Sequence, residues 1–476
     1  MFHSTKTDII VIGAGIGGYS AAFRAADLNK QVILIDERHA LGGVCLQEGC
    51  IPSKALLHLA NLIAQTDEML PYGLAYAARR LDLEKINDWK NNIVKRLTSG
   101  LQFLAQKRNV TVIKGQASFL NSQQVVVGTA EHQQTISFDN AIIATGSSPR
   151  HLNFLPKDSR IIHSTAALNV QNRPQSLLII GGGIIGLEMA TIYQSLGTQV
   201  CLVEQENQLI PSADSDLIAP LYKRMSQRIN IHLKVKVSQV SAKQEGLWVT
   251  FEGENIRNNP MRFDQILISI GRTPNINTLG LEKTAIKINP HGFISVNATL
   301  QTGEPHIYAI GDVIGQPMLA HKASAEGRRA AELIAMDRDQ TANIYTSLVP
   351  LVAYTNPEVA WVGLTEKKAT TDGVSYKKSV FPWIASGRAH ACNRTEGLTK
   401  LLFDPTTHQL LGAGVVGVHA GDIISELTLA IRLKATAMQI ANTIHPHPTL
   451  SESVMIAAEI FEGTATDVFM PKKSDK

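Results

Sequence analysis

Apolar residues follow this chain in short runs that stop at glycine-rich turns, a pattern that predicts buried strands. The first run, Asp8-Ile9-Ile10-Val11-Ile12, leads into Gly13-Ala14-Gly15-Ile16-Gly17-Gly18. An alanine-rich stretch from Tyr19 to Leu28 predicts a helix, and a second strand from Gln31 to Ile35 ends on Asp36. A continuous apolar strand followed by a helix and another such strand indicates a βαβ unit of a parallel sheet.

The same pattern recurs later at the same spacing. Leu177-Leu178-Ile179-Ile180 leads into Gly181-Gly182-Gly183-Ile184-Ile185-Gly186, and a helical stretch is followed by a strand from Gln199 to Val203 and by Glu204. Gly181 precedes Glu204 by 23 positions, which is also the separation of Gly13 and Asp36. Chance glycine-rich turns in an ordinary α/β fold are the alternative, but two matched copies argue against it.

These turns have the spacing of dinucleotide-binding loops. The first glycine allows a tight turn, the second lets the backbone approach a pyrophosphate, and the third lets helix and strand pack closely, while the acidic residue binds ribose hydroxyls. Two loops imply two dinucleotides. The candidate ligands are Gly13, Gly15, Gly18 and Asp36 in the first loop, and Gly181, Gly183, Ile184, Ile185, Gly186 and Glu204 in the second. Gln205-Glu206-Asn207 offers no cation for a 2′-phosphate, so the second loop favours NAD over NADP.

Three further apolar runs break at glycine, as parallel strands do at a ligand crevice. They are Asn140 to Gly146, Phe263 to Asn275 and His306 to Asp312. The residues that we expect at the crevice are Thr145, Gly146, Gly311 and Asp312 on FAD, and Gly271 and Arg272 on NAD. Asp312 suits a sugar hydroxyl of the flavin chain, and a helix-capping role is the alternative.

Composition narrows the class of protein. A chain of 476 residues is too long for one core, so we expect several domains. The net charge of +4 comes without a long basic run, which argues against nucleic-acid binding. No apolar stretch is long enough to span a bilayer. Fold-like sequence begins at Asp8, and with only four cysteines present we expect a cytoplasmic protein.

Two of those cysteines, Cys45 and Cys50, flank Leu46-Gln47-Glu48-Gly49 shortly after the first predicted loop. This setting indicates a redox pair, and two inert buried thiols are the alternative. A disulfide requires the chain to tighten between them, which Gly49 permits. Cys50 lies near a predicted helix start with Pro52 in its first turn, where a thiolate is stabilised. A thiol pair beside the first loop suggests that this loop holds a flavin.

A histidine and a glutamate near the C-terminus supply a candidate base. His447 precedes Glu452 by five positions, ahead of an apolar helix through Phe461. A carboxylate that orients an imidazole makes a general base, which a dithiol substrate needs because only the thiolate attacks a disulfide. The alternative is a capping box in which Thr449 is the N-cap and Glu452 is N3. Both roles are compatible if each of the two carboxylate oxygens of Glu452 serves one of them.

Taken together, these residues resemble the flavin-dependent disulfide reductases, the class I pyridine nucleotide-disulfide oxidoreductases. The resemblance spans essentially the whole chain. It covers the cysteine loop, both dinucleotide loops, Gly271 to Asn275, Met318 to Lys322, Tyr354 to Gly363 and His447 to Glu452. It implies an α/β fold with two Rossmann-like domains and a C-terminal α+β dimerisation domain, and NAD-dependent oxidation of dihydrolipoamide with FAD as cofactor.

The resemblance also implies roles for individual residues. Cys45 exchanges with lipoyl sulfur, Cys50 faces the flavin, and His447 and Glu452 reach the thiols of the other subunit of a homodimer. The His447–Pro448 peptide bond is expected to be cis. The other implied contacts are Lys54 and Glu188 at the reactive edge of the flavin, Gly43, Ala117, Met318, Leu319, Ala320 and His321 on FAD, and Val237 near the adenine of NAD.

The implied partner is the lipoyl-bearing acyltransferase core (E2 component) of a 2-oxo acid dehydrogenase complex or the lipoyl carrier protein of glycine cleavage. The expected domains are residues 1–147 for FAD, 148–270 for NAD, 271–346 as a central domain that completes the FAD site, and 347–476 as the interface domain. No metal is expected.

One departure from the family pattern leaves alternatives open. Members usually carry Asn-Val in the cysteine loop where this chain has Gln47-Glu48. A carboxylate there either raises the pKa of a nearby thiolate or points to solvent. The alternatives are another NAD(P)H-dependent disulfide reductase, such as one acting on glutathione, and a non-catalytic subunit that docks a lipoyl-bearing core.

Overall fold

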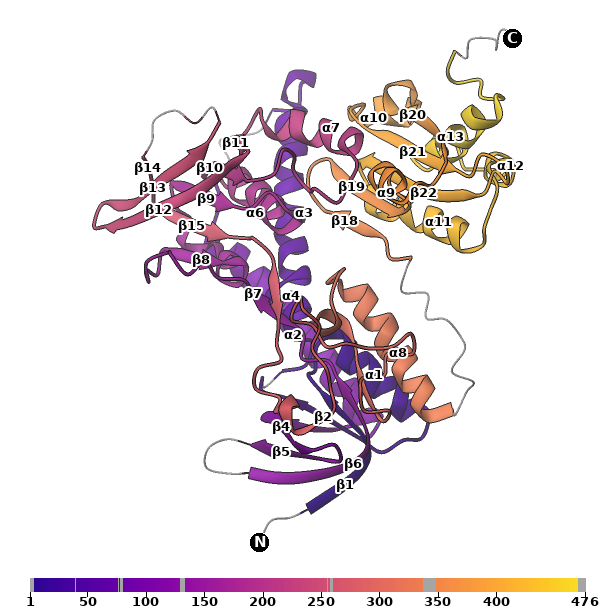
Figure 1. Cartoon of the computed structure of the whole chain (residues 1–476). Helices are drawn as coiled ribbons and strands as arrows, with labels where there is room; N and C mark the ends of the chain where they lie inside the picture. The colour runs from indigo at the N-terminus through magenta and orange to yellow at the C-terminus, as the bar shows by residue number, and fades with distance from the viewer. Residues whose placement is uncertain are drawn as a thin grey trace.

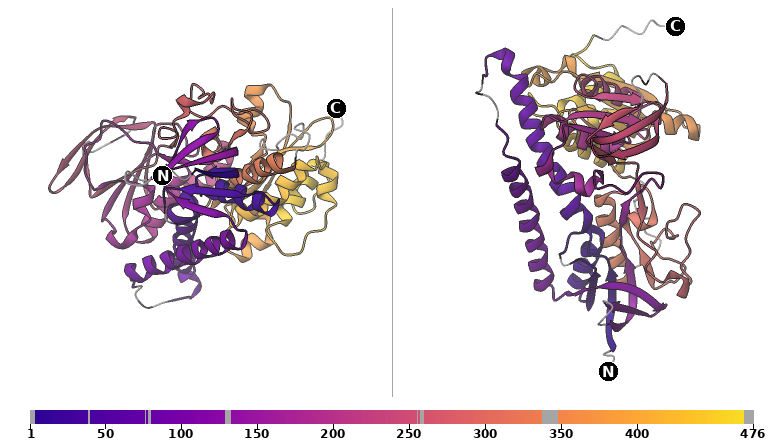
Figure 2. Two further views of the ribbon diagram at one scale, coloured as in Figure 1. Left: turned by 90° about the horizontal axis from the view of Figure 1, so that it is seen from below. Right: turned by 90° about the vertical axis from the view of Figure 1, so that its left-hand side faces the viewer.

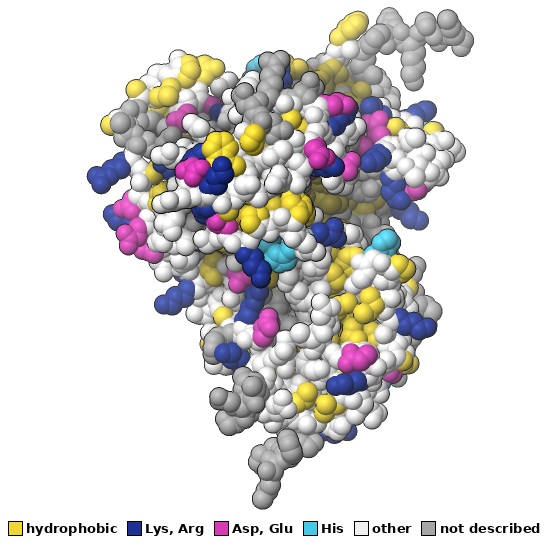
Figure 3. Space-filling model, turned by 60° about the vertical axis from the view of Figure 1, so that its left-hand side comes forward, with side chains coloured by type: hydrophobic (Ala, Val, Ile, Leu, Met, Phe, Trp, Pro, Cys, Tyr) yellow, Lys and Arg dark blue, Asp and Glu magenta, His cyan; other side chains and the backbone are white. Residues whose placement is uncertain are grey.

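The computed structural model describes residues 4–38, 40–75, 77, 80–128, 133–254, 256, 260–336 and 348–469. Figure 1 shows three units: one at the bottom that holds the N-terminus, a second at the upper left, and a C-terminal unit packed beside the second. The expected boundary between residues 346 and 347 lies outside the described residues. In the face drawn in Figure 3, acidic and basic side chains are scattered rather than gathered into one basic surface.

The first unit is built on a sheet in the order β3-β2-β1-β6-β5-β4, with β17 paired to β6. The pairs β1–β2, β1–β6, β2–β3 and β6–β17 are parallel, whereas β4–β5 and β5–β6 are antiparallel. The strands are β1 (Ser4–Ile12), β2 (Val32–Asp36), β3 (Thr111–Lys114), β4 (Gln116–Asn121), β5 (Gln124–Gly128), β6 (Gln133–Ile143) and β17 (Ile307–Ala309).

Helices cover this sheet and extend beyond it. In Figure 1, α1 lies beside α8 against the strands, and Figure 2 shows α3 and α4 as two long helices that run side by side. The helices of this unit are α1 (Ile16–Asp27), α2 (Gly43–Glu48), α3 (Cys50–Glu68), α4 (Leu83–Lys107) and α8 (Ala320–Met336). Strand residues such as Ile9, Val11 and Leu34 are fully buried, which explains the continuous apolar runs.

The second unit repeats this design with a parallel sheet in the order β11-β10-β9-β15-β8 and an antiparallel sheet in the order β12-β13-β14. The strands are β8 (Ile161–His163), β9 (Ser176–Ile180), β10 (Gln199–Glu204), β11 (Asn230–Leu233), β12 (Val235–Lys243), β13 (Gly246–Gly253), β14 (Met261–Phe263) and β15 (Gln265–Ile268). The helices are α5 (Ser164–Ala167), α6 (Ile184–Ser195) and α7 (Ser215–Met225).

Two short antiparallel strands join the units: β7 (Ser147–Pro149) pairs with β16 (Arg272–Pro274). One predicted strand is wrong here. The run from Phe263 to Ile270 is divided between β14 and β15, which belong to different sheets. The break falls at Asp264, whose carboxylate accepts hydrogen bonds from the backbone N–H (2.8 Å) and hydroxyl (3.0 Å) of Ser176.

The C-terminal unit is an antiparallel sheet in the order β18-β19-β22-β21-β20, with helices packed on it. Its strands are β18 (Leu351–Ala353), β19 (Glu358–Gly363), β20 (Lys377–Pro382), β21 (Leu398–Phe403) and β22 (Leu410–Gly417). Its helices are α9 (Glu366–Asp372), α10 (Gly387–Ala391), α11 (Ala420–Arg432), α12 (Ala437–Ala441) and α13 (Glu452–Glu462). Within the described residues, none of the helices is both long and apolar enough to cross a membrane.

Candidate active site

The two predicted dinucleotide loops have the same geometry. In the first, Oδ2 of Asp36 accepts the backbone N–H of Ala14 at 2.6 Å and Oδ1 accepts that of Arg38 at 2.8 Å. In the second, Oε2 of Glu204 accepts the N–H of Gly182 at 2.6 Å and Oε1 accepts that of Glu206 at 2.9 Å. Each carboxylate is thereby fixed at the end of its strand beside the loop, where the ribose of a dinucleotide would lie.

The glycines of both loops fit a pyrophosphate. A Cβ added to Gly13 or Gly18 would meet backbone oxygen at 2.3 Å or 1.7 Å, and one added to Gly181 or Gly186 would do so at 2.5 Å or 2.1 Å. By contrast, a Cβ on the second glycine of either loop, Gly15 and Gly183, would have no neighbour within 4 Å. The first and third glycines are thus required by packing, while the second faces open space that a phosphate can enter, at the start of α1 or α6.

Cys45 and Cys50 are brought together at the start of α3. Cys45 lies in α2, Cys50 opens α3, and a Cβ on the intervening Gly49 would lie 2.9 Å from the carbonyl oxygen of Val44. A hydrogen bond donated by the Cys45 thiol and the charge of Lys54 together lower the pKa of Cys50 to about 7. The same bond, with burial, raises the pKa of Cys45. Cys50 is therefore the more acidic thiol of the pair.

Lys54 and Glu188 meet beside this pair, although they come from different units. Nζ of Lys54 lies 2.9 Å from both carboxylate oxygens of Glu188, which is buried in α6. Oε1 of Glu188 also accepts the backbone N–H of Tyr354 at 3.2 Å, and the Lys54 ammonium lies 4.7 Å from the centre of the Tyr354 ring. Residues of all three units therefore converge close to Cys50.

His447 and Glu452 form the predicted pair. Nδ1 of His447 lies 2.8 Å from Oε1 of Glu452, while Oε2 accepts the backbone N–H of Thr449 at 2.6 Å. One oxygen of Glu452 therefore contacts the imidazole and the other binds the backbone, as expected. The predicted capping box is only half formed, because the Thr449 hydroxyl donates to the carbonyl of Pro446 and α13 begins only at Glu452. The His447–Pro448 bond is cis, as expected. The His447 side chain is 80% exposed in the single chain.

Asp312 and Arg272 meet at the junction of the two nucleotide-binding units. Oδ2 of Asp312 accepts the hydroxyl of Ser147 at 2.5 Å and lies 4.0 Å from Nε of Arg272. Nε of Arg272 also donates to that hydroxyl at 2.6 Å. Asp312 lies inside the short 3₁₀ turn Gly311–Ile314, whose N-cap position is Ile310, so its carboxylate is not the N-cap of that turn. The sequence grouped Arg272 with NAD, but its side chain contacts residues that follow the strands of the first sheet.

The remaining candidates lie on or near the predicted loops. Gly43 starts α2 directly against the first loop, since a Cβ there would lie 2.6 Å from the Cα of Gly15. The Thr145 hydroxyl donates to the carbonyl of Asn275 at 2.6 Å, and the Asn275 N–H donates to the carbonyl of Gly146 at 3.0 Å, which closes the junction. The others are Ala117 on β4, Val237 on β12, Ile184 and Ile185 at the start of α6, Gly271 before β16, Gly311 after β17, and Met318, Leu319, Ala320 and His321 at the start of α8.

Sequence reasoning assigned no role to three residues of this region: Ser147, Glu326 and Tyr354, of which Tyr354 was noted only as the start of the motif Tyr354 to Gly363. Glu326 is buried in α8, and its Oε2 accepts the backbone N–H of Gly311 at 2.8 Å, which positions the turn before Asp312. A charged residue in the apolar face of a helix was the available signal for Glu326. Ser147 and Tyr354 left no such signal, because only the meeting of separate units gives them their neighbours.

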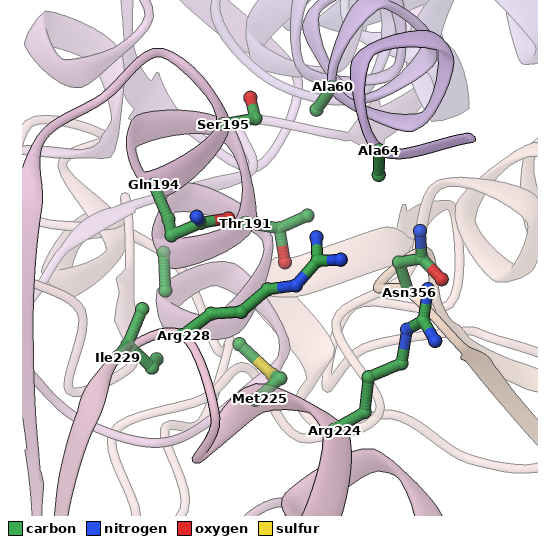
Figure 4. A pocket seen from close by; sticks show the side chains of 11 residues that line it. Ala60, Ala64, Thr191, Gln194, Ser195, Arg224, Met225, Arg228, Ile229 and Asn356 are labelled. Atoms are coloured by element: carbon green, nitrogen blue, oxygen red, sulfur yellow. The ribbon is translucent and has the colours of Figure 1, made fainter. Parts of the chain in front are cut away.

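A pocket further along α3 lies apart from the two thiols (Figure 4). Arg224 and Arg228 point into it from the second unit, Ala60 and Ala64 line it from α3, and Asn356 lines it from the C-terminal unit. Both arginines pair with the carboxylate of Glu68. The charges are therefore used in packing the units together, and we assign no chemistry to this pocket.

Comparison with known proteins gives a consistent result. The sequence pattern of the pyridine nucleotide-disulphide oxidoreductase family matches residues 7–327, and that of its dimerisation domain matches residues 349–458. A relative from Vibrio cholerae named dihydrolipoyl dehydrogenase is 45% identical over 477 residues, which cover 100% of both chains. One of the same name from Buchnera aphidicola subsp. Schizaphis graminum is 46% identical over 100% of this chain and 99% of the relative.

Solved structures show the same architecture. The crystal structure of LpdA from Mycobacterium tuberculosis is similar with a TM-score of 0.87 at 25% identity, over 96% of this chain and 99% of that one. A Cu(II) complex of the HOCl-induced flavoprotein disulfide reductase RclA from Escherichia coli gives a TM-score of 0.85 at 25% identity, with the same coverage. The likeness therefore extends over the nucleotide-binding units and the C-terminal unit alike.

Proposed function

Because this chain belongs to the pyridine nucleotide-disulphide oxidoreductase family, we propose that it acts as a dihydrolipoyl dehydrogenase, with FAD and NAD as cofactors. The observation that carries the proposal is the Cys45–Cys50 pair at the start of α3, in which Cys50 is the more acidic thiol. Full-length relatives that share this activity in their names support it.

The base of the reaction is His447. With its Nδ1–H donated to Glu452, the neutral imidazole keeps the lone pair of Nε2 free to take a proton from a thiol of dihydrolipoamide. The resulting thiolate attacks Sγ of Cys45 in the oxidised pair, a new S–S bond forms, and the Cys45–Cys50 bond breaks. Cys50 leaves as a thiolate, which its lowered pKa favours.

The second substrate thiol completes the exchange. The same imidazole, after releasing the first proton, takes the second one, and the new thiolate closes the lipoyl disulfide and releases Cys45. The substrate has then lost two electrons and two protons, and the cysteine pair has gained the electrons. Bound FAD would supply the two-electron chemistry that links the reduced thiol pair to hydride transfer onto NAD. Asp36 and the first loop would hold FAD, and Glu204 and the second loop would hold NAD.

The finer assignments belong to this proposal. Since the family's dimerisation domain matches the C-terminal unit and His447 is mostly exposed, we place His447 and Glu452 at the thiols of a second subunit. We retain the division into an FAD domain (1–147), an NAD domain (148–270), a central domain (271–346) and an interface domain (347–476). The partner is a lipoyl-bearing acyltransferase core or carrier protein, and the location is the cytoplasm.

The test is NADH formation by purified protein supplied with dihydrolipoamide and NAD, with NADP and reduced glutathione in parallel assays. Turnover only with dihydrolipoamide and NAD is the expected result. No lipoamide turnover by protein that binds FAD and still reduces a dye with NADH would overturn the substrate assignment. Glutathione turnover with NADP would favour the other class of disulfide reductase instead.

A further inference from the structure

The loop between the two thiols carries a glutamate whose charge is matched by an arginine of the first unit. Glu48 closes α2, and its Oε2 lies 3.4 Å from Nη2 of Arg38. Arg38 follows β2, and its backbone N–H donates to the carboxylate of Asp36 at 2.8 Å. The ion pair therefore joins the end of the thiol-bearing helix to the turn that holds the ribose-binding carboxylate.

Two further contacts hold α2 against the same turn. The side-chain amide of Gln47 donates to the carbonyls of Ala40 at 2.7 Å and Leu41 at 3.1 Å. At the start of α2, Gly43 packs directly on Gly15 of the first loop. Gln47 and Glu48, which depart from the family pattern in the cysteine loop, thus both hold α2 against the turn after β2.

The pair lies within electrostatic reach of the redox site. Glu48 precedes Cys50 by only two residues, and the charges of Asp312, Cys50, Arg38 and Glu48 all act on the guanidinium of Arg272 and its pKa. The charges of Lys54 in α3 and Glu188 in α6 act on the pKa of Cys50 itself. Nη1 of Arg38 is buried and has no hydrogen-bond partner within the described residues, so Arg38 depends on Glu48 to balance its charge.

We propose that Arg38 is a positioning residue for the redox pair, which holds Glu48 and neutralises its charge so that the carboxylate does not destabilise the Cys50 thiolate. The side chains of Arg38 and Glu48 are about one-third exposed, at 31% and 35%. An ion pair this exposed adds little to folding stability, so its main effect is on the local electrostatic potential. The inference rests on the proposed function only in taking Cys45 and Cys50 as the reacting thiols.

The test measures the thiol rather than turnover. Full-length, FAD-loaded protein in a Cys45→Ser background is treated with iodoacetamide between pH 5 and 9, and alkylation of Cys50 is followed by mass spectrometry of its peptide. Since the thiolate displaces iodide, the midpoint of the rate against pH reports the pKa of Cys50. Neither lipoamide nor NAD is needed, so failure of the proposed reaction does not affect this measurement.

Arg38→Met should raise the midpoint of the alkylation profile by about half a pH unit, because the unpaired Glu48 carboxylate then disfavours the Cys50 thiolate. Alkylation at pH 6 should therefore become about threefold slower. In a Glu48→Val background, the same change should raise it by less than half as much, because Arg38 acts through Glu48. Arg108→Met, which breaks the ion pair with Asp27 at the far end of α1, is the matched control and should leave the midpoint in place.

An equal shift in both backgrounds would overturn the proposal, since Arg38 would then act on the thiol directly. No shift from Arg38→Met in protein that retains FAD would also overturn it. Flavin absorbance and circular dichroism verify each variant, and Arg38→Gln replaces Arg38→Met if the latter loses FAD.

Discussion

Lys54 lies in α3 one turn after Cys50, and its ammonium is 2.9 Å from both oxygens of Glu188 in the second unit. The two charges act on the Cys50 thiol in opposite directions, because Lys54 lowers its pKa and Glu188 raises it. The Lys54–Glu188 ion pair therefore connects the two nucleotide-binding units and also influences the pKa of Cys50.

Removing the positive charge should weaken the thiolate. Lys54→Met is expected to raise the pKa of Cys50 from about 7 by roughly one unit, since a nearby cation favours the ionised form. The pH dependence of alkylation measures it. Glu188→Gln should move the pKa the other way, and shifts of the same sign in both variants would contradict the assignment.

The base is tested by separating the two half-reactions. His447→Gln and Glu452→Gln should lower turnover of dihydrolipoamide by about 10²–10⁴-fold, the usual contribution of general base catalysis. Reduction of a dye by NADH should persist, since that reaction bypasses the substrate thiols. Glu459→Gln, on the same helix, is the matched control. Wild-type lipoamide turnover in His447→Gln protein would show that another group takes the proton.

A second histidine anchors the segment that carries His447. Nε2 of His445 lies 2.9 Å from Oε1 of Glu426 in α11, and its Nδ1 lies 2.8 Å from the carbonyl oxygen of Thr443. Both ring nitrogens face acceptors, an arrangement that favours the protonated imidazole. The hydrogen bond to Glu426 comes first among the causes that raise the pKa of His445.

The raised pKa of His445 predicts how the stability of the folded protein depends on pH. Because the pKa is higher in the folded state than the unfolded value of about 6.5, the stabilisation is complete below that value and is lost as the pH rises through the folded pKa. Urea unfolding should therefore show a larger stability difference between wild type and His445→Gln at pH 6 than at pH 9. A larger difference at pH 9 would contradict the charged state.

Lys400 joins the second unit to the C-terminal unit. Its ammonium is fully buried and lies 2.7 Å from Asp214, 2.6 Å from Asp216 and 3.0 Å from Glu366. These three carboxylates have the spacing of a metal site, but the ammonium occupies their centre. Lys400→Met should therefore cost about 3–5 kcal/mol of unfolding free energy, because it removes the counter-charge of the buried Asp214 carboxylate.

The control for this prediction is Lys378→Met. Lys378 pairs with the same Glu366 at 3.1 Å but is 41% exposed, so its loss should cost under about 1 kcal/mol. Denaturant unfolding followed by tryptophan fluorescence measures both variants. Equal costs would show that burial of Lys400 does not govern the interaction.

Much of the fold follows from local pattern. The runs ending at Ile12 and Ile180 become β1 and β9, and the turns after them place Asp36 and Glu204 in matched positions because the spacing fixes the loop length. The pairing of His447 with Glu452 was also predicted, since both lie in one short segment.

Contacts between the units could not be predicted from local sequence pattern. Ser147 and Arg272 are 125 positions apart in the chain, and the meeting of β7 with β16 alone brings them to Asp312. The interruption at Asp264 was missed because its side-chain bonds to Ser176 form only in the folded sheet. Long-range partners decide these positions, and a single sequence carries no record of them.

The β7–β16 pair has a consequence for how the chain is partitioned. The polypeptide departs from the first sheet after Ile143 and rejoins it at Ile307, and its outgoing and returning strands are hydrogen-bonded neighbours. The second unit thus has its entrance and exit at one place, as an inserted domain does. The second unit could in principle be removed at the β7–β16 pair without the loss of a strand from the first sheet. One nucleotide-binding domain is therefore inserted into another of the same design.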